Sequence, residues 1–380
     1  MFVRVCDEFM APVSLRTEDM HEIDDKYAAP APARWTAAGA VPASAGEASL
    51  ADDDSIPCYL AFAPVEDEAT RAGLRRLVAL ARGQMGWKEA LASTEQAGML
   101  AYVTDTRRAA FLDLLPLAPQ SDILEIGPGR GQFTVALAQR TRHVHALEVV
   151  PEQAEFVLLR ARQEAARNVS VAIGGDDCRL PYRDAAFDGV VLNLVFEWCG
   201  SRIESESHAA AQTRLLREMV RVLKPGGFLY LATKNRFALR LLLGGADEHM
   251  ANVAFGSALP RRLAAWLLRR KGQSRPMGRL YSHDDLSAQL RRAGLVDVQS
   301  FWAAPEMRFP THYVRSDAAS VRAARARPGL RQGEGRKVNL LMRLVPAAWV
   351  RHVMPGLAFV GRKDRAGAAD GDLRRAGSAD

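Results

Sequence analysis

The sequence lacks any apolar run of the ~18–20 residues that a membrane-spanning helix needs. We also expect no secretory signal, because Asp7, Glu8 and Glu18 stand where a basic start and an apolar stretch belong. Cysteine is scarce and scattered, which excludes a disulfide scaffold, and no histidine lies in ligand spacing to a cysteine, so we expect no metal site. We therefore expect a cytoplasmic protein; its oligomeric state is not indicated.

Acidic residues are scarce everywhere except at the start of the chain. Residues 1–56 hold 11 Asp and Glu against 4 Lys and Arg, whereas the remainder holds 33 against 47. The acidic segment is rich in Ala, Pro and Ser and cannot bury enough apolar surface to offset its ordering entropy, so we expect disorder there. The basic body is compatible with phosphorylated, nucleic-acid or anionic-membrane partners, but charge alone does not choose among them.

The rest of the chain alternates between two hydrophobic periods. Helical spacing occupies a predicted extension over 57–101, with helices at 69–80 and 87–91, and continues at 102–115. Apolar strands then alternate with helices, at 123–126, 144–148, 169–173, 190–194 and 228–233. Such alternation is typical of parallel β-α-β units with right-handed crossovers.

The rhythm changes after the fifth strand. We expect a mostly helical insertion over 237–280, a helix at 284–293 and a strand at 296–302. Residues 306–355 are Arg-rich and predicted to be irregular, a last strand is expected at 357–361, and the tail 364–380 is predicted to be loose. The sequence thus predicts one domain over 102–363, with 237–280 and 306–355 as insertions on the substrate side. Its fold is expected to be α/β, a Rossmann-like seven-stranded, mostly parallel sheet with helices on both faces.

A glycine-rich turn joins the first of these strands to the next helix. Gly127, Gly129 and Gly131 follow Ile126, where the chain turns sharply and a ligand would lie against backbone that a Cβ would obstruct. Glu148 ends the next strand, 17 residues after Gly131, where a carboxylate is placed to accept hydrogen bonds from ribose hydroxyls. A nicotinamide dinucleotide is disfavoured, because Gln132 occupies the third glycine position of the Gly-x-Gly-x-x-Gly pattern.

Four ordered segments resemble the motifs of the class I S-adenosylmethionine-dependent methyltransferases, over roughly residues 102–303. The segments are Leu124-Glu125-Ile126-Gly127-x-Gly129-x-Gly131, Gly175-Asp176-Asp177-Cys178-Arg179-Leu180-Pro181-Tyr182, Phe187-Asp188-Gly189-Val190-Val191 and Arg217-Glu218-Met219-x-Arg221-Val222-Leu223-Lys224-Pro225-Gly226-Gly227.

The resemblance implies S-adenosylmethionine as cofactor and assigns a role to each matching position. The three glycines would pass close to its methionine and ribose, Glu125 would orient the methionine amino group, and Glu148 would hold the ribose. Asp176 would accept from the adenine amino group, the backbone of Asp177 would meet the ring, and Leu194 would face the sulfonium. The family usually has a small residue at position 177, and a capped turn is the alternative role for this pair.

The substrate side is expected after strands four and five, where loops meet the ligand crevice of a doubly wound sheet. Glu197 and His249 are the candidate catalytic residues, since imidazole titrates near neutral pH. Trp198, Lys234, Asn235 and Arg236 are candidate substrate-binding residues. The segment 305–313 is expected to fold back over the same cleft. A capping glutamate, a histidine bonded to a backbone carbonyl and solvated basic side chains are the structural alternatives.

Two resemblances bear on the acceptor. Residues 194–198 with 234–249 resemble a bacterial methyltransferase branch linked to polysaccharide and glycan biosynthesis. Asn193-Leu194-Val195-Phe196 also resembles the Asn-x-Pro-Tyr signature of methyltransferases that act on exocyclic adenine nitrogen, but Val195 replaces the proline. We therefore expect a sugar, a glycan precursor or another small molecule as acceptor. An RNA methyltransferase and a non-catalytic cofactor-binding module are the alternatives.

The stretch 259–280 contains seven basic residues and no acid. Leu263, Trp266, Leu267 and Leu268 are spaced to form the apolar stripe of an amphipathic helix beside them. Such a helix would act as a lid over an anionic substrate or dock peripherally on an anionic membrane. A solvated basic face above core leucines is the ordinary structural alternative, and the one we favour from the sequence.

Overall fold

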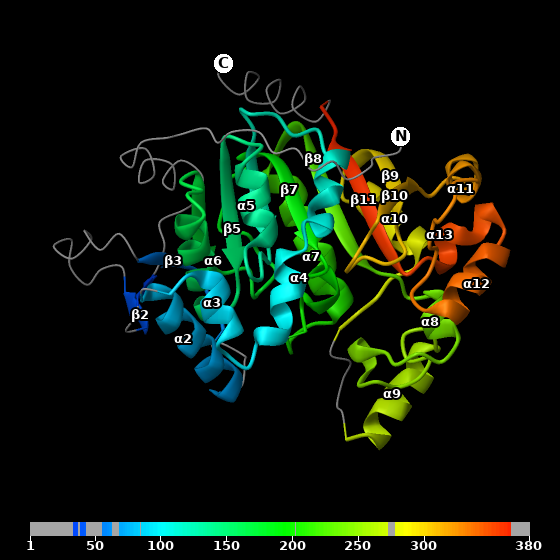
Figure 1. The fold of residues 1–380 in the computed structure, drawn as a ribbon, viewed down its shortest axis with the longest axis horizontal. Coiled ribbons are helices and arrows are strands. Elements are labelled where there is room, and N and C mark those ends of the chain that lie inside the picture. Colours follow the sequence, from blue (N-terminus) through cyan, green and yellow to red (C-terminus); the bar gives the residue numbers. More distant parts are fainter. Residues whose placement is uncertain are drawn as a thin grey trace, which may run out of the picture.

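A single mixed sheet organises the protein. The computed structural model describes residues 33–36, 39–42, 55–62, 68–83, 85–201, 203–272 and 278–365. Eleven strands of these residues pair in the order β10-β9-β11-β8-β7-β4-β5-β6-β3-β1-β2 (Figure 1). The strands are β1 (Ala33–Thr36), β2 (Gly39–Pro42), β3 (Ile56–Cys58), β4 (Asp122–Ile126), β5 (His143–Glu148), β6 (Val169–Ile173), β7 (Phe187–Asn193), β8 (Leu223–Lys234), β9 (Leu295–Ala304), β10 (His312–Arg315) and β11 (Gly356–Lys363).

Helices and short 3-10 turns join these strands. The helices are α2 (Glu68–Arg82), α3 (Trp87–Ala92), α4 (Leu100–Thr104), α5 (Gln132–Ala138), α6 (Pro151–Gln163), α7 (His208–Val222), α8 (Leu239–Leu242), α9 (Arg261–Arg270), α10 (His283–Arg292), α11 (Ala318–Arg325), α12 (Arg336–Leu344) and α13 (Val350–Val353). The 3-10 turns are η2 (Ala97–Met99), η3 (Thr106–Leu114), η4 (Phe196–Trp198), η5 (Glu248–Met250) and η6 (Ala347–Trp349).

The predicted Rossmann-like α/β fold is confirmed, with more strands than expected. Strands β4 to β8 pair in parallel, and β11 lies antiparallel between β8 and β9. These seven strands, β6-β5-β4-β7-β8-β11-β9, are the seven that the sequence indicates. The prediction missed β10 at one edge and β3, β1 and β2 at the other, because strands of three or four residues are too short to show a period-two pattern.

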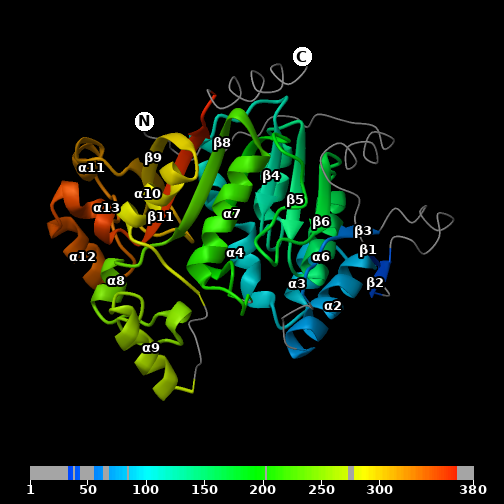
Figure 2. The same cartoon turned by 180° about the vertical axis from the view of Figure 1, so that it is seen from behind.

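Alternate side chains of the central strands pack into two apolar layers. On β4, Ile123 joins the core formed with α5, α6 and η3, whereas Leu124 and Ile126 join the core formed with α7 and α10. Figures 1 and 2 show these helix sets on opposite faces of the sheet. Because both faces are covered, β4 and β5 are buried along their whole lengths, as is usual for parallel sheets.

The helical extension packs on the outside of α6. Trp87 of α3 meets Phe156 of α6 edge-to-face, with ring centroids 6.4 Å apart. Arg71 and Arg82 of α2 form ion pairs with Glu152 and Glu155 of α6, each at 2.7 Å. Strands β1 and β2 lie within the segment 1–56 that was predicted to be disordered; residues 1–32 and most of the remainder of that segment lie outside the described residues, as does the tail 366–380.

Two secondary-structure predictions are wrong. A single helix over 102–115 is replaced by α4 and η3, because Asp105 has an extended backbone and its carboxylate caps Arg107 N–H. The segment 306–355, expected to be irregular, contains β10, α11, α12 and α13. Its many arginines conceal the apolar spacing; Val321, Met342 and Val350 are fully buried.

The predicted insertion between β8 and β9 contains α8, η5 and α9. Ala264 and Leu268 of α9 pack on Met250 and Val253, so this helix has an apolar cluster of its own. None of the described helices is both long enough and apolar enough to cross a membrane.

The packing of β7 against β8 gives a first prediction. A Cβ at Gly189 would lie 2.2 Å from the ring of Phe228, a side chain that is only 2% exposed. We expect Gly189→Ala to lower the free energy of unfolding by about 1–3 kcal/mol through overpacking, measured by urea denaturation. The control is Gly98→Ala, where a Cβ would meet nothing within 4 Å, and equal stability of the two variants would contradict the packing described.

Candidate active site

The turn after β4 has the backbone that its glycines predict. Gly127, Gly129 and Gly131 have φ values of +70°, +60° and +73°, a region that residues with a Cβ rarely adopt. A Cβ at Gly127 would lie 2.5 Å from Val195 Cγ2, so this glycine permits close packing against the loop after β7. A Cβ at Gly129 would meet nothing within 4 Å, so open space adjoins the backbone where a ligand is expected.

Glu148 is tied to this turn by hydrogen bonds. It ends β5 with 5% exposure, and its Oε2 accepts from Gly129 N–H at 3.3 Å. Its Oε1 accepts from Val149 N–H at 2.8 Å and Val150 N–H at 3.1 Å. Burial raises the pKa of Glu148, and the three backbone donors oppose that shift. Oε2 retains acceptor capacity beside the open space, which is compatible with the predicted ribose contact.

Glu125 lies below the same turn, within β4. Its exposure is 2%, and its Oε2 accepts from the Thr134 hydroxyl of α5 at 2.6 Å. Burial raises the pKa of Glu125 to about 7, and the Thr134 hydrogen bond opposes the shift. The carboxyl is therefore poised between its neutral and charged forms near neutral pH; its contact with the methionine amino group stays a prediction.

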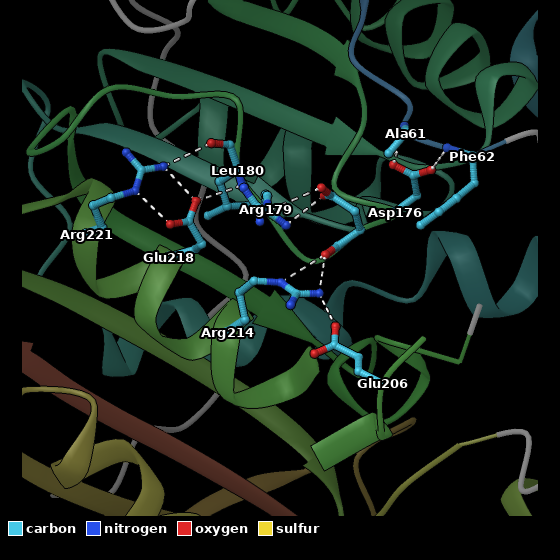
Figure 3. A network of polar contacts seen from close by, with 10 residues as sticks. Ala61, Phe62, Asp176, Arg179, Leu180, Glu206, Arg214, Glu218 and Arg221 are labelled. Carbon is cyan, nitrogen blue, oxygen red and sulfur yellow. Dashed lines mark hydrogen bonds and ion pairs between the residues drawn. The ribbon is translucent and has the colours of Figure 1, made fainter. Parts of the chain in front are cut away.

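Asp176 is already engaged by a segment that the sequence did not associate with the site. Its two carboxylate oxygens accept from Ala61 N–H at 3.1 Å and Phe62 N–H at 2.7 Å (Figure 3). This segment continues from β3, and Tyr59 N–H donates to Ile173 O at 2.7 Å at the end of β6. Residues 59–62 therefore lie at the predicted adenine position, and the adenine contact would use the remaining lone pairs of Asp176.

The loop that carries Asp176 and Asp177 is fastened to α7. Arg214 donates to the Asp177 carbonyl at 2.9 Å and pairs with Glu206. Farther along the loop, Leu180 N–H donates to Glu218 at 3.0 Å, and Arg221 donates to the Leu180 carbonyl at 3.0 Å (Figure 3). The loop belongs to the second of the four motifs, and Glu218 and Arg221 of the last motif hold it in place. This contact accounts for the presence of Glu218 and Arg221 in the last motif.

Leu194 follows β7 in a strained conformation. Its φ is +58°, sparsely populated for a residue with a Cβ, and its N–H donates to Ala232 O at 2.8 Å. Strain of this kind concentrates at functional sites. Leu194 lines a cavity of about 270 Å³ at the carboxyl ends of β7 and β8, so the residue predicted to face the sulfonium also faces this cavity.

The cavity wall is charged and balanced. Three cations line it, Lys234, Arg240 and Arg308, and so do three carboxylates, Glu248, Glu306 and Glu334. Lys234 pairs with Glu248, and Arg308 lies 3.5 Å from the same carboxylate. Burial, reinforced by Arg308, lowers the pKa of Lys234 to about 8, and burial raises the pKa of Glu306. Glu306, Met307 and Arg308, from the segment 305–313 that was expected to fold back over the cleft, lie on this wall. That the wall belongs to the substrate cleft, rather than to a buried structural loop, stays a prediction.

A buried histidine–aspartate pair lies next to the wall. His249 and Asp247 are each 1% exposed, and His249 Nδ1 lies 3.3 Å from Asp247 Oδ1. Burial raises the pKa of Asp247, but hydrogen bonds from His249 and Ser257 lower it overall. His249 Nε2 has no hydrogen-bond partner in the described parts of the chain and lies 4.0 Å from Glu248 Oε1. One imidazole nitrogen is thus oriented by Asp247, and the other is buried without a hydrogen-bond partner among the described residues.

The other predicted substrate-side residues divide into two groups. Trp198 stacks on His249 with ring centroids 4.5 Å apart, whereas the buried Glu197 carboxylate accepts from the Thr233 hydroxyl at 2.7 Å. Asn235 lines the cavity, but its amide donates to the carbonyls of His352 and Met354. Arg236 donates to the carbonyls of Ser257 and Leu259 and faces a second cavity of about 430 Å³.

Sequence reasoning did not select several residues of this site. Asp247 and Glu248 directly precede His249 in the sequence, so their proximity was detectable. Nothing in the pattern indicated that Asp247 is buried. Glu334 reaches the cavity from a segment about 85 residues away along the chain from His249, and Ala61 and Phe62 reach Asp176 from more than 110 residues away. No local signal in the sequence reveals such contacts.

Comparison with known proteins identifies the domain. Residues 124–231 match the family model described as a methyltransferase domain. A stretch of 129 residues is 36% identical to the demethylmenaquinone methyltransferase of Deinococcus radiodurans, and covers 33% of this chain and 47% of that protein. Another of 126 residues is 34% identical to the biotin biosynthesis bifunctional protein BioHC of Cellvibrio japonicus, covering 33% of this chain and 22% of that protein.

A solved structure also aligns, at low identity. It is an N-methyltransferase of Haemonchus contortus in complex with phosphomonomethylethanolamine and S-adenosylhomocysteine, with 14% identity, a TM-score of 0.42, and coverage of 72% of this chain and 60% of that one. The chain spans less than half the length of the two curated relatives above.

These matches and the glycine turn define a class I S-adenosylmethionine-dependent methyltransferase domain. Its cofactor is S-adenosylmethionine, and the residues present fit that group. The open backbone at Gly129 and the buried Glu148 carboxylate offer the surface and the acceptor that a ribose and a methionine moiety need.

The buried carboxyl of Glu125 gives a second prediction. Because its pKa is raised to about 7, the folded protein holds a proton that the unfolded chain releases, so stability falls as pH rises toward and through 7. Between about pH 5.5 and 8 we expect the wild type to lose about 2 kcal/mol of unfolding free energy that Glu125→Gln retains. Urea denaturation at both pH values measures this, with the exposed Glu89→Gln as control. Parallel losses in the wild type and Glu125→Gln would contradict the shifted titration.

Proposed function

We propose that this protein transfers a methyl group from S-adenosylmethionine to a hydroxyl oxygen of a sugar, a glycan precursor or another small polar molecule. The observation that carries the proposal is the buried Asp247–His249 pair, whose unpartnered Nε2 lies 4.0 Å from Glu248, a residue that lines the charged cavity at the carboxyl ends of β7 and β8. The methyltransferase domain supports the transfer itself, and the pair supports an oxygen acceptor.

A hydroxyl acceptor explains why a base would be needed. The cofactor supplies a methyl group on an activated sulfonium, so alignment of the acceptor provides much of the catalysis. A hydroxyl also has to lose its proton, and imidazole is suited to accept it near neutral pH. Asp247 would act as a positioning residue that orients the ring through Nδ1. The proton would pass from the acceptor hydroxyl to His249 Nε2, which lies 4.0 Å from Glu248 on the cavity wall.

The cavity favours a small and polar acceptor. Its volume of about 270 Å³ is at the low end of ligand sites, and its charged groups provide both donors and acceptors for hydroxyls. Three carboxylates offset its three cations, an arrangement unlike the excess of positive charge that a phosphate backbone requires. This balance supports a sugar or another neutral molecule over RNA, which is the alternative that the sequence left open.

The names of the relatives do not point to one class of acceptor. They refer to biotin biosynthesis, demethylmenaquinone methylation and ribosomal RNA methylation, none of which is a glycan reaction. The glycan assignment therefore rests on the resemblance of residues 194–198 and 234–249 and on the polar cavity. Trp198 and Lys234 would contact the acceptor, and Glu197 would hold Thr233 in place.

The base assignment gives a third prediction. With labelled cofactor and a panel of hydroxylated acceptors, we expect His249→Gln to lower kcat about 10²–10⁴-fold, the usual contribution of general base catalysis. Asp247→Asn should lower kcat and shift its pH profile, because the ring loses its orienting acceptor. S-adenosylhomocysteine binding should be unchanged in both variants, which shows that the fold is intact. The partly exposed His352→Gln is the matched control.

Three outcomes would contradict the proposal. Full turnover by His249→Gln would remove the base from the mechanism. Turnover on a defined RNA oligonucleotide, abolished by Asn193→Ala and indifferent to His249→Gln, would establish the nucleic-acid alternative. Cofactor binding without transfer to any acceptor would favour a non-catalytic binding module.

A further inference from the structure

The exposed large apolar side chains are concentrated at one end of the molecule. Among the described residues eleven are exposed, and eight of these lie in the two stretches 242–266 and 340–349. The first stretch includes the N-terminal part of α9, and the second includes the C-terminal part of α12 and all of η6. Single exposed apolar residues are normal on a protein surface, but a concentration of this kind marks an interaction site.

Helix α9 carries large apolar side chains on its exposed side as well as on its packed side. Ala264 and Leu268 are buried against the insertion, which accounts for the core part of the predicted stripe. Leu263 and Trp266 are instead 44% and 42% exposed. The Arg270 guanidinium lies over the Trp266 ring at 4.0 Å, which leaves a cation beside an exposed aromatic side chain.

Helix α12 and the turn η6 continue the same character. Leu340, Leu344 and Trp349 are 61%, 73% and 65% exposed, more than the apolar side chains of α9. Only Met342 of α12 is fully buried. In both views α8 lies between α9 and α12, and α12 packs against α8, so these elements share one end of the molecule (Figures 1 and 2).

The charged side chains of α9, α12 and η6 are all basic. Between residues 251 and 272, and again between 336 and 353, the sequence contains no Asp or Glu. Exposed cations flank the apolar side chains in both stretches; they are Arg262, Arg269, Arg270, Lys271, Arg336 and Lys337. An interfacial helix that lies in the headgroup region of an anionic bilayer typically has exposed leucine and tryptophan beside arginine and lysine.

We propose that α9, α12 and η6 form a docking surface for an anionic lipid bilayer. Leu263, Trp266, Leu340, Leu344 and Trp349 enter the headgroup boundary, and the flanking arginines and lysines meet anionic headgroups. A bilayer satisfies both features at once, because it offers an apolar interior and a negatively charged surface. A solvated basic face does not explain why the apolar side chains are exposed.

The docking surface adjoins the proposed acceptor site. Arg240 and Leu241 of α8 and Val338 of α12 line the cavity of about 270 Å³. Docking would therefore hold the cavity close to the membrane, where an acceptor carried on a lipid would reach it. This consequence rests on the proposed function, whereas the docking itself does not and is measured without any acceptor.

The test is partition of the full chain onto vesicles. We expect binding to phosphatidylcholine vesicles with about 30% phosphatidylglycerol to exceed binding to pure phosphatidylcholine by about tenfold or more, and to weaken with salt. The double variants Leu263→Ser/Trp266→Ser and Leu340→Ser/Leu344→Ser should each lower partition by about tenfold or more. The matched control is Met99→Ser/Val296→Ser, two apolar residues exposed to 39% and 41% on η2 and β9, which should bind as the wild type.

Each alternative has its own result. Absence of vesicle binding, or binding that salt abolishes and that neither double variant weakens, would overturn the proposal. Lipid-free dimers detected by analytical ultracentrifugation and lost in the same double variants would assign the surface to a second copy of this chain. Unchanged S-adenosylhomocysteine binding in every variant confirms that the fold is intact, so failure of docking is distinguishable from failure of the methyltransferase assignment.

Discussion

The turn after β4 is the constraint on which the rest of the site depends. Three residues in the left-handed region reverse the chain between a buried strand and α5, and only glycine adopts that backbone without strain. Glu148 at the end of β5 holds the turn through its hydrogen bond from Gly129, and Val195 in the loop after β7 packs against Gly127. Because parallel strands end at the same edge, this arrangement brings the cofactor residues and the acceptor cavity together.

Around this turn the protein uses distant segments to complete its pocket. The backbone of residues 61 and 62 occupies the Asp176 carboxylate, and α7 holds the loop that carries it. On the acceptor side, segments near residues 194, 234, 248, 306 and 334 meet at one charged wall. The additions at both edges of the sheet therefore contribute to the site. The segment after β3 contacts the predicted adenine position, and segments between β9 and β11 line the cavity.

The sequence indicated the central fold well because burial on both faces gives strong signals. β4 and β6 are mostly apolar and are buried along their whole lengths, and their connecting glycines and helices have characteristic spacing. The same reasoning failed for β3 and β10, which are short edge strands, and at Asp105, where a local cap ended a helix that apolar spacing would continue. Asp176 shows the limit at the site, since its partners are backbone groups of a remote segment and backbone groups leave no trace in residue type.

Substrate-side residues were harder to infer than cofactor residues for a similar reason. The predicted cofactor contacts fall in short motifs within β4 and at the carboxyl ends of β4, β5, β6 and β7, whereas the wall around Lys234 assembles side chains from several loops. His249 was recognisable by its chemistry, but its orientation by Asp247 required the structure. The strain at Leu194 and the exposure of Trp266 were likewise invisible, because both are properties of the packed chain.

The central claim is that this chain binds S-adenosylmethionine at the glycine turn, and titration calorimetry with S-adenosylhomocysteine tests it most directly. The account predicts measurable binding that weakens by about 1–3 kcal/mol in Glu148→Ala, the scale of lost hydrogen bonds to a charged group, and that is unchanged in the exposed variant Glu89→Ala. A folded protein with no affinity for S-adenosylhomocysteine or S-adenosylmethionine, or one that prefers a nicotinamide dinucleotide, would contradict it.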